Sequence, residues 1–147
     1  MNVRKSLGSD HEAIDHRLSD LVNAVEGADF RTVLQVFRED DRGLRAHIDG
    51  EERYLFGGFE EHHPREIGEL RKDHERFRRA LDELSIETEL HTLRKERIDD
   101  LVAQLRAHAS KENATLYQWA DEPSYGEQRD ALFAFLEERR MALRNES

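Results

Sequence analysis

Apolar residues recur along this chain in steps of three and four over four long stretches, separated by short segments without such a pattern. This spacing places the apolar side chains on one face of an α-helix, so it predicts four amphipathic helices. The four stripes are Leu7, His11, Ile14, Leu18, Leu21 and Val25; Phe30, Val33, Phe37, Leu44, His47, Glu51 and Leu55; Ile67, Leu70, His74, Phe77, Leu81 and Leu84; and Ile98, Leu101, Leu105, His108, Glu112, Thr115 or Leu116, and Trp119.

The segments between the stripes carry signals that begin and end helices. Ser9, with Glu12 three residues later, has the pattern of a capping box at the start of the first helix. Gly27 marks the end of that helix. Residues 57–64 interrupt the second helix, and their proline suits the first turn of the third.

Long helices joined by short links are typical of a helical bundle. The sequence therefore predicts an all-α fold, an up-down-up-down four-helix bundle with a short extra C-terminal helix from about Glu127. We expect a single domain over residues 1–147, with the core bundle at about residues 7–120 and a C-terminal appendage at residues 121–147.

Each apolar stripe contains polar residues at positions that the pattern reserves for leucine or isoleucine. A buried carboxylate is costly unless it is paired or bound to a metal ion, and a buried imidazole needs partners for both nitrogens. Six such residues on four facing helices therefore predict one shared polar site. The six residues are His11, His47, Glu51, His74, His108 and Glu112.

The positions of these six residues are consistent with one level of an antiparallel bundle. Residues at the same height are mirrored about each turn, which places the three turns near residues 30, 61 and 92. The first two match interruptions in the pattern. The third connection is weakly marked, between Ser85 and Thr92, and must lie at the Thr92 end of this interval.

Histidine and glutamate four residues apart project from one helix face, one turn apart, and can bind metal together. The predicted assignment is His11 and His47 on one ion, His74 and His108 on the other, and Glu51 and Glu112 as bridges. An oxo or hydroxo bridge would complete the pair of ions. Nitrogen and carboxylate ligands without sulfur suit two iron ions (Fe2+ or Fe3+), with zinc or manganese as alternatives.

Composition and charge restrict the partners of such a site. The 147 residues are 37% hydrophobic and 38% charged, which allows one domain with a modest core. The absence of cysteine excludes thiolate ligands and disulfides. The net charge of −10 disfavours nucleic acid and anionic membranes as partners. Because no segment has the pattern of a signal peptide or membrane span, we expect a cytoplasmic protein. Separately, we expect a monomer.

The order of the six residues resembles the hemerythrin-like domain, also called the HHE cation-binding domain. The shared pattern is a histidine, a His-x-x-x-Glu pair, a histidine and a second His-x-x-x-Glu pair, in the segments DHEAID, HIDGEERYLF and HASKENATLYQW. The resemblance covers about residues 7–120. It implies a non-haem di-iron centre that handles dioxygen, peroxide or related small molecules, or that senses iron. It also implies that the four histidines are terminal ligands and the two glutamates are bridges.

One position departs from the family pattern. Oxygen-carrying members have a second histidine four residues away on the third helix, but no histidine stands four residues before or after His74. Tyr54, seven residues after His47, is the best candidate for an extra ligand, and Tyr117 and Glu52 are weaker ones. More open coordination favours peroxide turnover or sensing over reversible oxygen carriage.

Two classes of function follow. The first is a di-iron protein that binds or turns over dioxygen or peroxide, as an oxygen binder, a catalase-like enzyme or a ferroxidase. The second is an iron-responsive regulatory or iron-handling bundle without turnover. A purely structural bundle predicts instead that His74→Ala is tolerated.

The further pair His62 and Glu66 straddles a proline and is expected to be exposed. Asp15, four residues after His11, is at most a partner of that histidine.

Overall fold

The computed structural model describes residues 2–146, and the side chains of residues 2–142. All regular structure in this part of the chain is helical, which confirms the prediction of an all-α fold. The elements are α1 (Val3–Glu26), α2 (Phe30–Glu51), a π-helical turn (Glu52–Phe56), α3 (Gly57–Phe59), α4 (Pro64–Glu89), α5 (Lys95–Ala114), α6 (Leu116–Ala120), a 3₁₀ turn (Pro123–Tyr125) and α7 (Gly126–Glu146). Residues 1 and 147 of the predicted domain lie outside the described residues.

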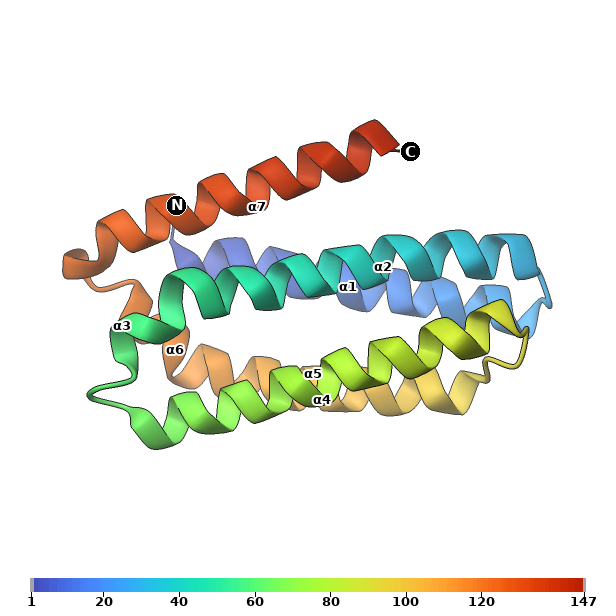
Figure 1. The fold of residues 1–147 in the computed structure, drawn as a ribbon, viewed down its shortest axis with the longest axis horizontal. Helices are drawn as coiled ribbons and strands as arrows, with labels where there is room; N and C mark the ends of the chain where they lie inside the picture. Colours follow the sequence, from blue (N-terminus) through green and yellow to red (C-terminus); the bar gives the residue numbers. More distant parts are fainter. Residues whose placement is uncertain (1, 147) are drawn as a thin grey trace.

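Four long helices, α1, α2, α4 and α5, lie side by side around a common core (Figure 1). α1 packs against α2 and α5, and α4 packs against the same two helices. Residues 27–29 connect α1 to α2, and residues 90–94 connect α4 to α5. The connection from α2 to α4 spans residues 52–63 and includes the π-helical turn and α3. α7 lies outside this group, against α2 and the π-helical turn (Figure 1). None of the helices in residues 2–146 combines the length and the apolar character that a bilayer crossing needs.

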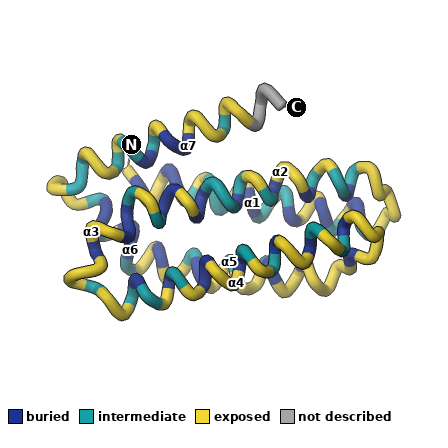
Figure 2. Tube along the Cα trace, viewed as in Figure 1, coloured by how far each residue is buried: buried dark blue, intermediate teal, exposed yellow. Residues whose placement is uncertain are grey.

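Two apolar clusters fill the core and leave a band between them for polar residues. The first cluster includes Ile14, Leu44, Phe77 and Leu101, and the second includes Leu7, Leu55, Leu70 and Leu116. Along the chain, the histidine and glutamate positions of the predicted site lie between a residue of one cluster and a residue of the other, on each long helix or the short helical element that follows it. Figure 2 shows the buried positions as an inner stripe on these helices. Apolar burial at both ends thus holds the polar band in place.

The start of α1 differs from the prediction. α1 begins at Val3, so the capping box predicted at residues 9–12 is wrong. Asn2 is the N-cap, and its side chain accepts a hydrogen bond from the Lys5 N–H at 2.8 Å. The Val3 N–H donates to the Asp121 carboxylate at 2.6 Å. The Asn2 carboxamide and the Asp121 carboxylate thus satisfy N–H groups that have no partner within the helix. Asp121 lies far from α1 in the sequence.

The connection between α4 and α5 confirms the turn that the mirror relation places near residue 92. α4 ends at Glu89, and residues 90–94 lie at the Thr92 end of the predicted interval. His91 takes the left-handed conformation here, with φ of 57°. Glycine usually occupies such a position after a helix, and its absence explains why the boundary is weakly marked in the sequence.

The C-terminal helix α7 is 21 residues long, so the prediction of a short extra helix is wrong. Leu132, Phe135 and Leu136 of α7 are buried and belong to the second apolar cluster. Gly50 allows α2 and α7 to approach closely, since a Cβ there would lie 3.0 Å from the Leu132 side chain. α7 therefore contributes to the core as well as covering α2.

The packing of α7 predicts that Leu132→Ala lowers the free energy of unfolding by about 2–5 kcal/mol, because the substitution leaves a cavity in a packed core. Met141→Ala on the same helix is the control, since this side chain is 52% exposed and its loss should cost less than about 0.5 kcal/mol. Denaturant unfolding of the three proteins measures both values. Equal, small effects would contradict the docking of α7 on α2.

Candidate metal centre

The six residues predicted to form one site lie together in the polar band. They are His11 on α1, His47 and Glu51 on α2, His74 on α4, and His108 and Glu112 on α5. They form two groups that could hold a metal ion, and within each group the ligand atoms lie within 4.8 Å of one another. One group is Glu51, His74, His108 and Glu112, and the other is His11, His47 and Glu112. His62, from the remaining His-x-x-x-Glu pair, is exposed as predicted.

The Nε2 atoms of the four histidines face the two glutamates. The closest approaches are 3.2 Å from His74 to Glu51, 3.6 Å from His47 to Glu51, 3.2 Å from His108 to Glu112 and 3.4 Å from His11 to Glu112. Each carboxylate therefore lies between one histidine of each predicted pair. A carboxylate that bridges two cations has to occupy this kind of position.

The unpaired atoms of the cluster fit a cation. Glu51, His74 and Glu112 are fully buried. Among the described residues, four atoms of the cluster have no hydrogen-bond partner, namely Glu51 Oε1, His74 Nε2, His108 Nε2 and Glu112 Oε2. The short distances between nitrogen and oxygen here lack hydrogen-bond geometry. An unpaired buried polar group costs about 1–3 kcal/mol, and bound cations would take up the lone pairs of all four atoms.

In three of the histidines, the second ring nitrogen, Nδ1, forms a hydrogen bond with a carboxylate. This bond fixes the orientation of the ring. The hydrogen bonds run from His47 Nδ1 to Asp10 at 3.3 Å, from His74 Nδ1 to Glu52 at 2.8 Å and from His108 Nδ1 to Asp73 at 2.8 Å. An ionised carboxylate only accepts hydrogen bonds, so Nδ1 carries the proton in each case. When a ring is neutral, its Nε2 then presents a lone pair to the centre, as a metal ligand requires.

Each of these three carboxylates is held in turn by a cationic side chain. The ion pairs are Arg140 with Asp10 at 2.6 Å, Arg78 with Glu52 at 2.7 Å and Lys111 with Asp73 at 2.5 Å. The first cation comes from α7, and the other two come from α4 and α5. The centre is thus surrounded by charge pairs that fix the imidazole rings.

The aspartates among these supporting residues were not predicted from the sequence. Asp10 directly precedes His11, but its carboxylate serves His47 on the neighbouring helix. Asp73 likewise precedes a cluster histidine and serves one on the next helix. Asp15, considered as a partner of His11, instead forms an ion pair with Arg106 of α5 at 3.0 Å. An aspartate immediately before a ligand histidine is the signal that could have found the two supporting residues.

Tyr117, the weaker candidate for an extra ligand, brings its hydroxyl to the centre, and Tyr54, the preferred candidate, lies beside α7. The Tyr117 oxygen lies 2.7 Å from Glu51, 3.0 Å from Glu112 and 3.1 Å from His11 Nε2. The Tyr54 ring packs against an α7 phenylalanine, with ring centroids 5.5 Å apart. The π-helical turn at Glu52–Phe56 rotates Tyr54 off the face that ideal helical spacing assigns to it.

The two halves of the centre have the same arrangement of residues, but the aromatic ring beside the histidine carries a hydroxyl in only one of them. Tyr117 stands five residues after Glu112 and stacks on His11, with centroids 5.8 Å apart. Phe56 stands five residues after Glu51 and stacks on His74, with centroids 5.0 Å apart. The half that contains His11 therefore has a polar ring beside it, and the half that contains His74 has an apolar one.

Burial and the neighbouring charges shift the pKa values of the cluster in opposite directions. Burial lowers the pKa of His47 and His74, but the adjacent carboxylates outweigh it and raise both to about 9. Burial and the charge of Glu112 raise the pKa of Glu51. Burial raises the pKa of Glu112 too, but the facing histidines hold it well below its usual range. Burial, with both glutamates, raises the pKa of Tyr117 well above its usual range, so its hydroxyl keeps the proton.

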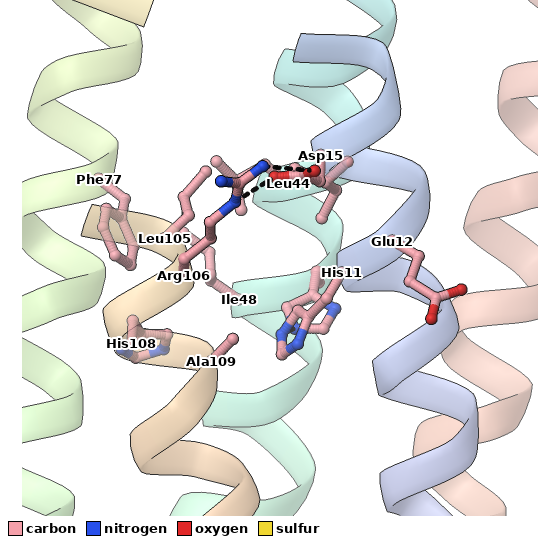
Figure 3. Close-up of a pocket in the computed structure, with 12 residues that line it drawn as sticks. His11, Glu12, Asp15, Leu44, Ile48, Phe77, Leu105, Arg106, His108 and Ala109 are labelled. Carbon is pink, nitrogen blue, oxygen red and sulfur yellow. Dashed lines mark hydrogen bonds and ion pairs between the residues drawn. The ribbon is translucent and has the colours of Figure 1, made fainter. Parts of the chain in front are cut away.

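A pocket of about 210 Å³ leads to the centre between α1 and α5 (Figure 3). Its inner end is formed by His11, His47 and His108. Its walls are largely apolar, and the ion pair between Asp15 and Arg106 lies at its outer end (Figure 3). A small molecule that enters here meets the histidines of both predicted pairs.

Fold and site together define a class, a helical domain with a buried cation site of histidine and glutamate. The model of the hemerythrin HHE cation binding domain family matches residues 3–120. The chain therefore belongs to the hemerythrin HHE cation-binding domain family, as its sequence pattern predicted, and is a metal-binding helical domain. Neither a curated protein nor a solved structure matches it. α7 lies beyond the matched residues.

The raised pKa values predict opposite pH dependences for stability and for metal binding. In metal-free protein, His47 and His74 have pKa values of about 9, above the ordinary 6.5. Their charged forms stabilise the fold below pH 6.5, and this stabilisation is lost as the pH rises through about 9. The melting temperature should fall by about 5 °C over this window, while cation affinity rises because ligand imidazoles must be neutral.

Thermal melts and chelator competition across this pH window measure the two trends. His74→Gln should flatten the decline in melting temperature, and His62→Gln, at an exposed position, should leave it unchanged. A melting temperature of the native sequence that stays constant through the window would contradict the charge pairing described for the cluster.

Proposed function

We propose that this chain is a non-haem di-iron protein that binds dioxygen or peroxide at this centre and decomposes peroxide. The observation that carries the proposal is the position of Glu51 and Glu112, each between one histidine of either pair. Two cations that share both carboxylates need this arrangement. Ligands of nitrogen and oxygen without sulfur favour iron and are compatible with zinc or manganese.

The proposed ligands follow from these distances. They are His11 and His47 for one ion, His74 and His108 for the other, and Glu51 and Glu112 as bridges. An oxo or hydroxo group would complete the bridge. Four protein ligands per ion leave positions for a small molecule, which favours peroxide chemistry over reversible oxygen carriage. Two ferrous ions, when bound, would supply the two electrons that reduce one hydrogen peroxide to water, and a second hydrogen peroxide, oxidised to dioxygen, would return them.

The groups of the protein itself hold a proton and limit the entry of water. The Tyr117 hydroxyl lies 3.1 Å from His11 and 3.4 Å from His47, two of the histidines at which the pocket ends. It is the proton donor that cleavage of an oxygen–oxygen bond requires on this side. Leu44 and Phe77 line the approach and keep it largely apolar.

We also propose that α1, α2, α4 and α5 run alternately up and down in the bundle. The packing of successive long helices against one another and their short connections support this order. It also explains how residues from four helices reach one level, because each turn reverses the direction in which the chain passes the centre.

An iron-responsive module without turnover is the second candidate, and one contact favours it. Arg140 of α7 binds Asp10 at 2.6 Å, and Asp10 accepts a hydrogen bond from His47. Because α7 lies outside the family match, this contact links the metal centre to an added element that a partner could contact. Binding of iron at His47 would then alter the position of α7.

Peroxide decay on iron-loaded protein tests the proposal. We expect turnover of hydrogen peroxide, and we expect Tyr117→Phe to slow it by about 100-fold, in the range for loss of one general acid. Tyr125→Phe is the matched control, because that ring packs on Phe59 with centroids 4.5 Å apart and forms no part of the cluster. Ultraviolet absorbance follows the peroxide.

Two results would contradict parts of this proposal. Absence of peroxide decay, together with a large rise in melting temperature on iron binding, would support the iron-responsive module instead. Equal rates for Tyr117→Phe and the native sequence would show that the tyrosine does not supply the proton.

A further inference from the structure

The pocket that ends at the centre is much larger than dioxygen or hydrogen peroxide needs. Its volume is about 210 Å³. One water molecule needs only about 10–15 Å³ by a comparable measure, and an engineered apolar cavity of about 150 Å³ binds benzene. The space next to His11 and His108 therefore accommodates an organic body of at least the size of a benzene ring.

The walls of this pocket are chemically unsuited to a small, strongly polar molecule. The apolar lining consists of Ile14, Leu44, Ile48, Phe77, Leu105 and Ala109. Hydrogen peroxide carries two donors and several lone pairs, and it finds no hydrogen-bond partner along these side chains. An apolar body gains free energy by leaving water for the same surface. The walls thus contribute to binding only if the ligand has an apolar part.

The lining residue Glu12 points away from this space in Figure 3, and the other polar groups lie at the two ends of the pocket. The inner end presents imidazoles of the centre, and Figure 3 shows Ala109 beside His108 and facing the space toward His11. The outer end carries the ion pair of Arg106 and Asp15, with a distance of 3.0 Å. A ligand that matches this layout has one polar head, directed inward, and a compact apolar body behind it.

We propose that the pocket binds small organic hydroperoxides, with an aromatic or branched alkyl body on the apolar walls and the peroxide group at the histidines. This inference rests on the proposed function, since it names the substrate class of the same centre. It goes further because it makes the body of the substrate, and not only the oxygen–oxygen bond, a source of affinity.

The ion pair at the outer end acts as a removable cover. Arg106 and Asp15 come from α5 and α1, the two helices that flank the opening, and are joined by two contacts of 3.0 and 3.1 Å. Both side chains are well exposed, with 70% and 42% of their areas accessible. Exposed ion pairs contribute little to stability, so this one can open to admit a bulky ligand.

The binding of cumyl alcohol to the full chain loaded with zinc tests the inference without any redox step. This alcohol has the same body as cumene hydroperoxide and is the product of its reduction. Calorimetric titration should show saturable binding to the native sequence. Ala109→Phe should weaken it by about tenfold or more by filling the pocket. Ala107→Phe is the matched control, because Ala107 is exposed on the same helix, and it should change affinity by less than about twofold.

Leu105→Phe narrows the same pocket nearer its outer end and serves if Ala109→Phe does not fold. Absence of saturable binding to the native sequence, or equal binding by the pocket and control variants, would overturn the inference. Failure of this inference and failure of the proposed function are distinguishable. Peroxide turnover without alcohol binding overturns only the former. Alcohol binding by the zinc-loaded chain, together with no peroxide decay after loading with iron, overturns only the latter.

Discussion

The burial of two glutamates and three histidines beside a partly exposed fourth, His11, in the middle of a helical bundle is the constraint on which the rest of the structure depends. Any one of these groups alone would destabilise the core, because burial removes its water without replacing it. Together they satisfy part of one another's needs, and Glu51 and Glu112 lie between histidines of both pairs. Among the described residues, four buried atoms of the cluster have no hydrogen-bond partner, and bound cations would resolve that cost.

The surrounding structure keeps these groups in place and makes the two halves of the centre different. Apolar clusters pack on both sides of the polar band, and carboxylates backed by cations hold three imidazole rings from behind. One half has Tyr117 beside His11, and the other has Phe56 beside His74. The pocket is lined by both histidines of the half with Tyr117, His11 and His47, and by His108 alone of the other half. The two halves therefore differ both in the neighbouring aromatic ring and in their access to the pocket.

The sequence predicted those features that regular helical spacing determines. His11 and His74 interrupt apolar stripes at positions that a regular helix buries, and the structure brings both into the cluster. Features that depend on irregular backbone or distant contacts were missed. The π-helical turn at Glu52–Phe56 directs Tyr54 away from the centre. The break between α5 and α6 at Thr115, with φ of −129° and ψ of −85°, directs Tyr117 toward it. The cap from Asp121 is a tertiary contact, which no local pattern reveals.

The number of ferrous ions that one chain binds is the measurement that tests the central claim most directly. Anaerobic calorimetric titration of metal-free protein should reach two ions per chain, one for each histidine pair. Glu112→Gln should weaken both binding events, since Glu112 belongs to both groups. A plateau at one ion or none, or two ions that bind with unchanged affinity to the Glu112 variant, would contradict a centre built on shared carboxylates.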